Sequence, residues 1–308
     1  MKYFNIRKDI LATLAYFNMF DYPLKKNEIF LFLGHCNDYR EFEQALTNLL
    51  RDSAVYKMAE FYSLQNDFKL AIRRFRGNEK AIGMLKKAEK AAAIISAFPF
   101  IRGVAVSGSL SKYFADEQSD IDFFIITQAN RLWIARTLLH IFKKLTFIVR
   151  RQSYFCMNYF IDEKDLAIME KNIYTAIEVA TVLPLRDNGI FEQFFKANSW
   201  ASVFLPNKFL HTPTVKKTGK SWIKSLTEKS LKNRFGDSLD NFLMNRTAKS
   251  WNAKTQSNRT DNKGMLMSMY VDKHVSKPNP EVFQKKILAC YENSLSEIFK
   301  RCELSVAK

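Results

Sequence analysis

The sequence is poor in glycine and proline, with 9 and 7 among 308 residues. This scarcity excludes collagen-like, elastic and proline-rich linker proteins. The four cysteines lie far apart and form no CxxC pair, so we expect free thiols in a reducing compartment. No run reaches the roughly 18 uncharged apolar residues of a membrane span, and the charged N-terminus is unlike a signal peptide. The sequence therefore predicts a cytoplasmic protein that does not contact the membrane.

Acidic residues are also outnumbered. The chain carries 48 Lys and Arg against 31 Asp and Glu, a net charge of +17, and +11 of it lies in residues 201–308. A basic third can attract a polyanion such as nucleic acid or a nucleotide phosphate, but a solvated lysine-rich surface explains the charge equally well. The hydrophobic content of 47% is typical of a globular protein, and the length suggests about two to three domains.

Residues 1–68 predict three helices followed by a β-hairpin. The second helix is expected over 26–33 with Gly34 as its C-cap, and two short apolar runs form the hairpin, 55–58 and 61–64. This order resembles a winged helix-turn-helix domain, in which the third helix enters the DNA major groove. Here that helix begins Tyr39-Arg-Glu-Phe-Glu-Gln and is not basic, which favours packing or protein contact over sequence-specific DNA binding.

Residues 69–100 predict one long connecting helix that ends before Pro99, with Ile82, Leu85, Ala88, Ala92 and Ile95 at its helical period. Residues 101–165 then alternate between strand and helix, which is typical of an α/β unit. The expected strands are 103–106, 121–126 and 154–161, and the expected helix is 131–145.

Residues 166–308 predict a mainly helical, basic region. Within it, the polar stretch 247–263 predicts a mobile loop, and a last helix follows Pro280. The expected fold class is therefore α+β, with a winged-helix-like unit, a small mixed-sheet core and a helical C-terminal region.

The chemistry-bearing residues lie between the first two core strands. Gly108-Ser109 ends one apolar strand, and Asp120-Ile-Asp122 opens the next ten residues later. Side chains two apart on a strand share a face, so the carboxylates would project together, with Cα atoms about 7 Å apart. Carboxylates this close repel unless a cation lies between them, and Mg²⁺ prefers carboxylate and phosphate oxygens. The pair therefore predicts a platform for a metal-bound triphosphate.

Gly108 and its neighbours are the candidates for holding that triphosphate. Glycine lets the backbone approach a phosphate, Ser109 adds a hydroxyl, and Lys112 lies one turn further on. Ser119, directly before the acidic pair, completes the candidate nucleotide-binding set. Taken singly, the serine is as well explained by a helix cap and the aspartates by a surface turn, and the spacing of the two pieces is what favours a site.

This segment resembles the signature of the DNA polymerase beta-type nucleotidyltransferase superfamily over residues 100–162. The resemblance implies transfer of a nucleoside monophosphate from an NTP to a hydroxyl or phosphate acceptor, with Mg²⁺ or Mn²⁺ as cofactor. It implies that Gly108 and Ser109 hold the triphosphate and that Asp120 and Asp122 bind the metal. The acceptor can be a nucleic acid, a small molecule or a protein, including the partner in a toxin–antitoxin pair.

The third acid of this signature is not evident. Its expected strand carries Asn158, which can ligate a metal through its oxygen but is a poor base, or can hydrogen-bond within the sheet. Glu170 and Glu178 could supply a base from the following helices, and Glu178 is expected to be buried with a partner or aimed into a cleft. The alternative function is a catalytically weak or inactive regulator that keeps the fold and binds nucleotide or nucleic acid.

Overall fold

The N-terminal unit contains the expected helices and hairpin. Its helices are α1 (Lys2–Asn18), α2 (Lys26–Leu31) and α3 (Tyr39–Arg51), and its strands are β1 (Leu24–Lys25), β2 (Tyr56–Met58) and β3 (Phe61–Ser63). β3 pairs antiparallel with both β1 and β2. The hairpin turns through Ala59, whose φ of 53° lies in the left-handed region. The cap expected at Gly34 is wrong, because α2 ends at Leu31 with Phe32 as its C-cap.

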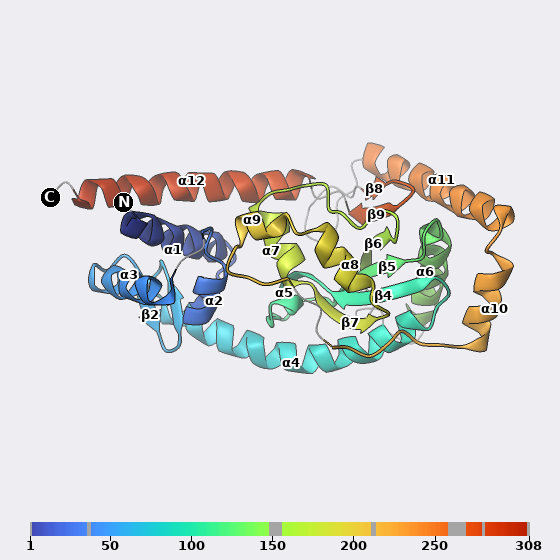
Figure 1. The fold of residues 1–308 in the computed structure, drawn as a ribbon, viewed down its shortest axis with the longest axis horizontal. Helices are drawn as coiled ribbons and strands as arrows, with labels where there is room; N and C mark the ends of the chain where they lie inside the picture. The colour runs from blue at the N-terminus through green and yellow to red at the C-terminus, as the bar shows by residue number, and fades with distance from the viewer. Residues whose placement is uncertain are drawn as a thin grey trace.

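This computed structural model describes residues 2–35, 38–147, 156–210, 214–257, 269–278 and 281–306. Figure 1 shows an elongated molecule with the N-terminal unit at one end, a central sheet and the pair α10–α11 at the other end. No helix within the described ranges is long and apolar enough to cross a membrane.

Helix α4 (Phe68–Ser96) runs from the N-terminal unit to the sheet, as the sequence predicted (Figure 1). It packs on the sheet through small side chains, since Ala81, Ala88 and Ala92 are fully buried with Ile95. Ile82 was expected on this face and is instead 57% exposed. Small residues let the helix backbone approach the sheet closely. Ala81 is therefore the residue buried on this face, and its larger neighbour Ile82 is not.

The central sheet has six strands in the order β7-β4-β5-β6-β9-β8. Strand β5 is antiparallel to β4 and parallel to β6, and β4–β7, β6–β9 and β8–β9 are antiparallel pairs. Helix α6 (Leu132–Phe147) forms the crossover between the two parallel strands. The strands span, in chain order, β4 Ile101–Val106, β5 Asp122–Thr127, β6 Cys156–Asp162, β7 Leu183–Asp187, β8 Met269–Val271 and β9 Val275–Pro278.

Three of these strands, β7, β8 and β9, come from the region expected to be mainly helical. The sequence did not predict them, and they carry the sheet beyond the expected core of residues 101–165. The described residues of that region otherwise form helices joined by loops, in agreement with the expected helical content. Its helices are α7 (Ile173–Thr181), α8 (Ile190–Ala197), α9 (Ala201–Phe204), α10 (Trp222–Ser230), α11 (Arg234–Gln256) and α12 (Glu281–Val306).

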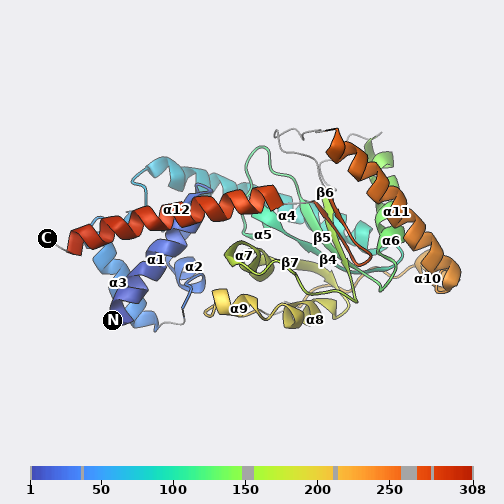
Figure 2. The ribbon, with the colours of Figure 1, turned by 90° about the horizontal axis from the view of Figure 1, so that it is seen from above.

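The mobile loop expected over 247–263 is wrong for 247–256, because α11 continues through Gln256. The earlier turns of α11 carry Leu239 and Leu243, which pack on the core that includes α6. Because adding a turn to an existing helix costs less than forming a new one, the polar residues continue this helix. The rest of that prediction, from residue 258 on, lies outside the described residues. After β9, α12 returns along the molecule to lie beside α1 (Figures 1 and 2).

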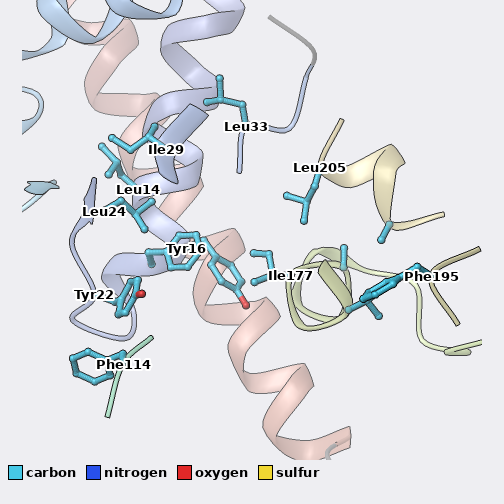
Figure 3. Packing of buried hydrophobic residues seen from close by; sticks show 14 of the residues in the cluster. Leu14, Tyr16, Tyr22, Leu24, Ile29, Leu33, Phe114, Ile177, Phe195 and Leu205 are labelled. Carbon is cyan, nitrogen blue, oxygen red and sulfur yellow. The ribbon is translucent and has the colours of Figure 1, made fainter. Parts of the chain in front are cut away.

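Both faces of the sheet are covered. On β5 and the residue before it, Ile121, Phe123 and Ile125 join the core formed with α4 and α6, whereas Phe124 and Ile126 join a second core. That second core includes α7, α8 and the N-terminal unit. Figure 3 shows its contact region, where Tyr16 and Tyr22 lie near Ile177 of α7 and Phe114. The N-terminal unit and the sheet therefore share one hydrophobic core, and the candidate site lies at this junction.

Candidate functional site

A cavity of about 270 Å³ lies against the face of β5 that carries Asp122 and Phe124. Ser107 and Gly108 border it where β4 ends, and helix α7 closes the opposite side. Three carboxylates and one ammonium group reach it, and each comes from a different part of the chain. These groups are Asp122 on β5, Glu170 before α7, Glu178 on α7 and Lys277 on β9.

Gly108 and Asp122 lie next to each other at the edge of this cavity. The Ser107 amide donates to the Asp122 carbonyl over 2.9 Å, which joins the turn after β4 to the start of β5. Gly108 has a φ of +68°, and a Cβ there would lie 3.2 Å from Asp122 Oδ2. Because Gly108 has no side chain, the space between this turn and the Asp122 carboxylate stays open.

Asp120 is exposed and lies two residues before β5. Ile121, between the two aspartates, is buried in the core on the opposite face of the sheet. Asp120 is not part of the cavity wall formed by Asp122. The structure thus brings one member of the acidic pair to the glycine turn and leaves the other at the solvent-exposed approach to β5.

Lys112 and Glu178 form an ion pair beside the turn. Lys112 Nζ lies 2.7 Å from Glu178 Oε1 and donates to the Gly108 carbonyl over 3.0 Å. Both side chains, with exposed Ser109, border a second cavity of about 320 Å³. The two cavities share Gly108, Tyr174 and Glu178, so they adjoin each other at the turn. Glu178 therefore both has a partner and faces the cavities.

The remaining candidates are placed differently. Ser119 donates to Asp116 Oδ1 over 2.7 Å. Ser119 borders neither of the two cavities. Asn158 falls at the irregularity where Met157 pairs with Phe123 and Tyr159 pairs with Phe124. Its side chain lies outside the described residues. Tyr159, the next residue, borders the first cavity.

Buried phenols and paired charges give the site its electrostatic character. Burial raises the pKa of Tyr174, and the carboxylates of Glu178 and Asp122 raise it further. Burial is the largest single effect on Glu170 and acts to raise its pKa, but the hydrogen bond and charge of Lys277, together with a backbone hydrogen bond, outweigh it and lower the pKa. Glu170 is thus held as a carboxylate by its lysine, while the tyrosine stays a neutral hydrogen-bond donor.

The donor set around the turn consists of hard oxygen ligands. Asp122 supplies a carboxylate of the kind that Mg²⁺ prefers, whereas Asp120 lies at the exposed approach to β5, outside the cavity wall. In the part of the chain that the structure describes, no three His, Cys, Asp or Glu side chains gather into a metal-binding group.

Tyr159, Tyr174 and Lys277 were not anticipated from the sequence. Tyr174 and Tyr159 are single aromatic residues in apolar segments, a pattern that also fits core packing. Lys277 lies on β9, a short strand that the sequence pattern does not reveal. Only its position in a strand next to β6 brings it to Glu170.

Replacing Gly108 by Ala should destabilise the protein and impair the site. A left-handed backbone conformation with a side chain costs about 1–2 kcal/mol, and the new methyl group would press on the Asp122 carboxylate. Thermal denaturation should show a lower Tm. Gly83→Ala is the matched control, since Gly83 is an exposed residue of α4 with no atom near its Cβ position, and it should raise the Tm slightly. A Gly108→Ala protein as stable as wild type would contradict this account of the turn.

Comparisons with known proteins gave no match: no protein-family model fits the sequence, and no curated protein or solved structure is significantly similar to it.

Proposed function

We propose that this protein is a magnesium-dependent nucleotidyltransferase that moves a nucleoside monophosphate from an NTP to an acceptor. The observation that carries the proposal is the placement of Gly108, with its positive φ, against Asp122 at the edge of a cavity. An open turn and a carboxylate in contact are what a metal-bound triphosphate requires, because the backbone can approach the phosphates while the carboxylate holds the cation.

The order of the elements supports the same function. From α4 to α7, helices and strands alternate as α4-β4-α5-β5-α6-β6-α7, with α5 spanning Gly108–Ser111. The glycine turn follows β4, and β4 pairs with β5, the strand that begins at Asp122, in one mixed sheet. This arrangement agrees with the resemblance found in the sequence between residues 100 and 162.

Each residue of the site has a role in this proposal. Asp120 and Asp122 would hold Mg²⁺, which supplies charge neutralisation and alignment of the triphosphate when bound. The Gly108 backbone and the Ser109 hydroxyl would bind phosphate oxygens. Lys112 would donate from its ammonium group to the same phosphates, and its ion pair with Glu178 would weaken as a result. Glu178 reaches both cavities, so it is placed to accept the proton of an acceptor hydroxyl that enters through the second one.

We also propose a winged-helix-like fold for the N-terminal unit, on the basis of its element order α1-β1-α2-α3-β2-β3. The apolar face of α3 is buried, with Phe42, Leu46 and Leu49 in the shared core. This burial supports the packing role that the sequence favoured for the third helix.

Nucleotide binding and transfer test the main proposal. The full chain should bind an NTP in the presence of Mg²⁺ and lose that binding in EDTA, as measured by calorimetry. With α-phosphate-labelled NTP and a pool of acceptors from a cell lysate, it should transfer label and release pyrophosphate. Failure of all four ribonucleotides and their deoxy forms to bind with Mg²⁺ would contradict the proposal.

A nucleotide-binding regulator without turnover is the second candidate. It is favoured by the pairing of both cavity glutamates with lysines, Glu170 with Lys277 and Glu178 with Lys112. A carboxylate committed to a lysine is a weaker acceptor for a substrate proton. The same assay separates the two functions, because a regulator would bind Mg²⁺–NTP and release no pyrophosphate with any acceptor pool.

A further inference from the structure

A basic groove of about 500 Å³ runs along the outer side of α4. Four cationic residues of the helix line it, and they are spaced 4, 3 and 4 residues apart, which places them on one face of the helix. They are Lys69, Arg73, Arg76 and Lys80. The opposite wall comes from the segment after α5 and includes Phe114 and two carboxylates, Asp116 and Glu117, so four cations face two acidic residues.

Most of these charges are not neutralised within the protein. Arg73 donates to the carbonyls of Phe20 and Asp21 and lies 3.7 Å from Asp116. Lys69, Arg76 and Lys80 are exposed, and no ion pair with any described residue involves them. The stripe from the first to the last cation is about 16 Å long at the rise of an α-helix. Three exposed cations along such a line form a positive stripe that attracts a linear polyanion.

Exposed apolar side chains follow the stripe along its neighbouring face. Phe68 and Phe75 are 58% and 45% exposed, and Ile72 and Ile82 continue the same row. At 100° per residue, Ile72 lies nearest to the cations, and Phe68 and Phe75 lie roughly a third of a turn around the helix from them. A single strand whose phosphates contact the cations can turn its bases toward these rings on the adjoining face, and phosphate contacts combined with base stacking are how such strands are bound.

The groove leads to the candidate site. It shares Arg73, Phe114 and Asp116 with the second cavity, and that cavity contains Ser109 and Lys112. A strand bound along α4 would thus extend toward the turn at Gly108.

We propose that α4 binds single-stranded nucleic acid along Lys69, Arg73, Arg76 and Lys80, and that this strand is the acceptor. The identification of the strand as acceptor rests on the proposed nucleotidyltransferase activity. The binding itself does not, because the groove and its charges are independent of Asp122 and of any NTP.

Fluorescence anisotropy with a labelled oligonucleotide of about 15 residues tests the groove on the full chain. The double variant Arg76→Ala/Lys80→Ala should weaken binding at least about tenfold at about 50 mM salt, and the slope of log affinity against log salt should become shallower by about 1.4. The control Lys232→Ala/Lys249→Ala removes two exposed cations at the other end of the molecule and should change neither quantity.

Three results would overturn the groove proposal. They are wild-type protein that does not bind the oligonucleotide, equal loss in the control and in the α4 variant, and tighter binding to vesicles rich in phosphatidylserine than to the strand. The measurement is made in EDTA without NTP, so its outcome is separate from that of the NTP assay. Oligonucleotide binding that depends on Arg76 and Lys80, together with no Mg²⁺–NTP binding, would refute the enzyme and keep the groove.

Discussion

Replacing Asp122 by Asn should remove magnesium-dependent NTP binding and reduce nucleotidyl transfer by about 10²- to 10³-fold, the effect of losing several kcal/mol of metal-mediated stabilisation. Asn has nearly the same shape as Asp. The backbone bond from Ser107 to residue 122 and the close approach to Gly108 should therefore persist. What changes is the charge that faces the cavity. Asp120→Asn should act in the same direction, because the proposal assigns both carboxylates to one ion.

Calorimetric titration of Mg²⁺–NTP into each variant measures this effect. Glu192→Gln is a suitable control, since Glu192 is an exposed carboxylate of α8 and borders neither cavity. It removes the same charge and should bind NTP as wild type does. Equal Mg²⁺-dependent affinity in wild type and Asp122→Asn would reject the metal site, however well both proteins fold.

The part of the site that sequence reasoning could predict is local in the chain. Gly108 and Asp122 are 14 residues apart, and Gly108 follows β4 while Asp122 opens the adjacent antiparallel strand β5, so two apolar runs and the connection between them place them together. The same reasoning found β4, β5, β6, α4 and α6, because the strands are short apolar runs and the helices have apolar residues at the helical period. The alternation on β5 also separates the two cores as expected of a strand covered on both faces.

The part of the site that the sequence did not predict depends on contacts between segments that are far apart in the chain. Lys277 meets Glu170 across 107 residues, and Lys112 meets Glu178 across 66. Nothing near Lys112 in the sequence indicates a carboxylate partner, so the sequence suggested only a phosphate ligand. Strands β8 and β9 have three and four residues, too few to show a period, and they form only because β6 offers an edge for pairing. The polar C-terminal part of α11 was not predicted, because it is helical as the continuation of earlier turns that pack on the core.

The largest stability effect should come from Arg74, which is buried where α4 meets the N-terminal unit. Its guanidinium donates to the Pro23 carbonyl and to Glu28 over 2.9 and 2.8 Å and lies 3.7 Å above the Tyr22 ring. The side chain is 2% exposed. Arg74→Met keeps the apolar stem but leaves the carbonyl and the carboxylate without their donor. Breaking such a buried pair costs about 3 kcal/mol, and we expect a fall in Tm of about 5 °C or more for a chain of this size.

The matched control is Arg76→Met on the same helix, where the guanidinium is exposed, and thermal denaturation should leave its Tm within about 1 °C of wild type. The double variant Arg74→Met/Glu28→Gln should recover part of the lost stability, because it removes the uncompensated carboxylate. Equal Tm values for Arg74→Met and Arg76→Met would contradict this role.

The same substitution should also reach the candidate site, although Arg74 borders neither cavity. Tyr22 stacks under Arg74 and donates its hydroxyl to the Lys112 carbonyl over 2.6 Å. Loss of the guanidinium removes the contact on one face of the Tyr22 ring. Lys112, which accepts the hydrogen bond from Tyr22 and is proposed to bind phosphate, would then be held less firmly. Arg74→Met should therefore weaken Mg²⁺–NTP binding several-fold at a temperature where the variant remains folded. Unchanged affinity there would show that the N-terminal unit supports the fold without positioning the site.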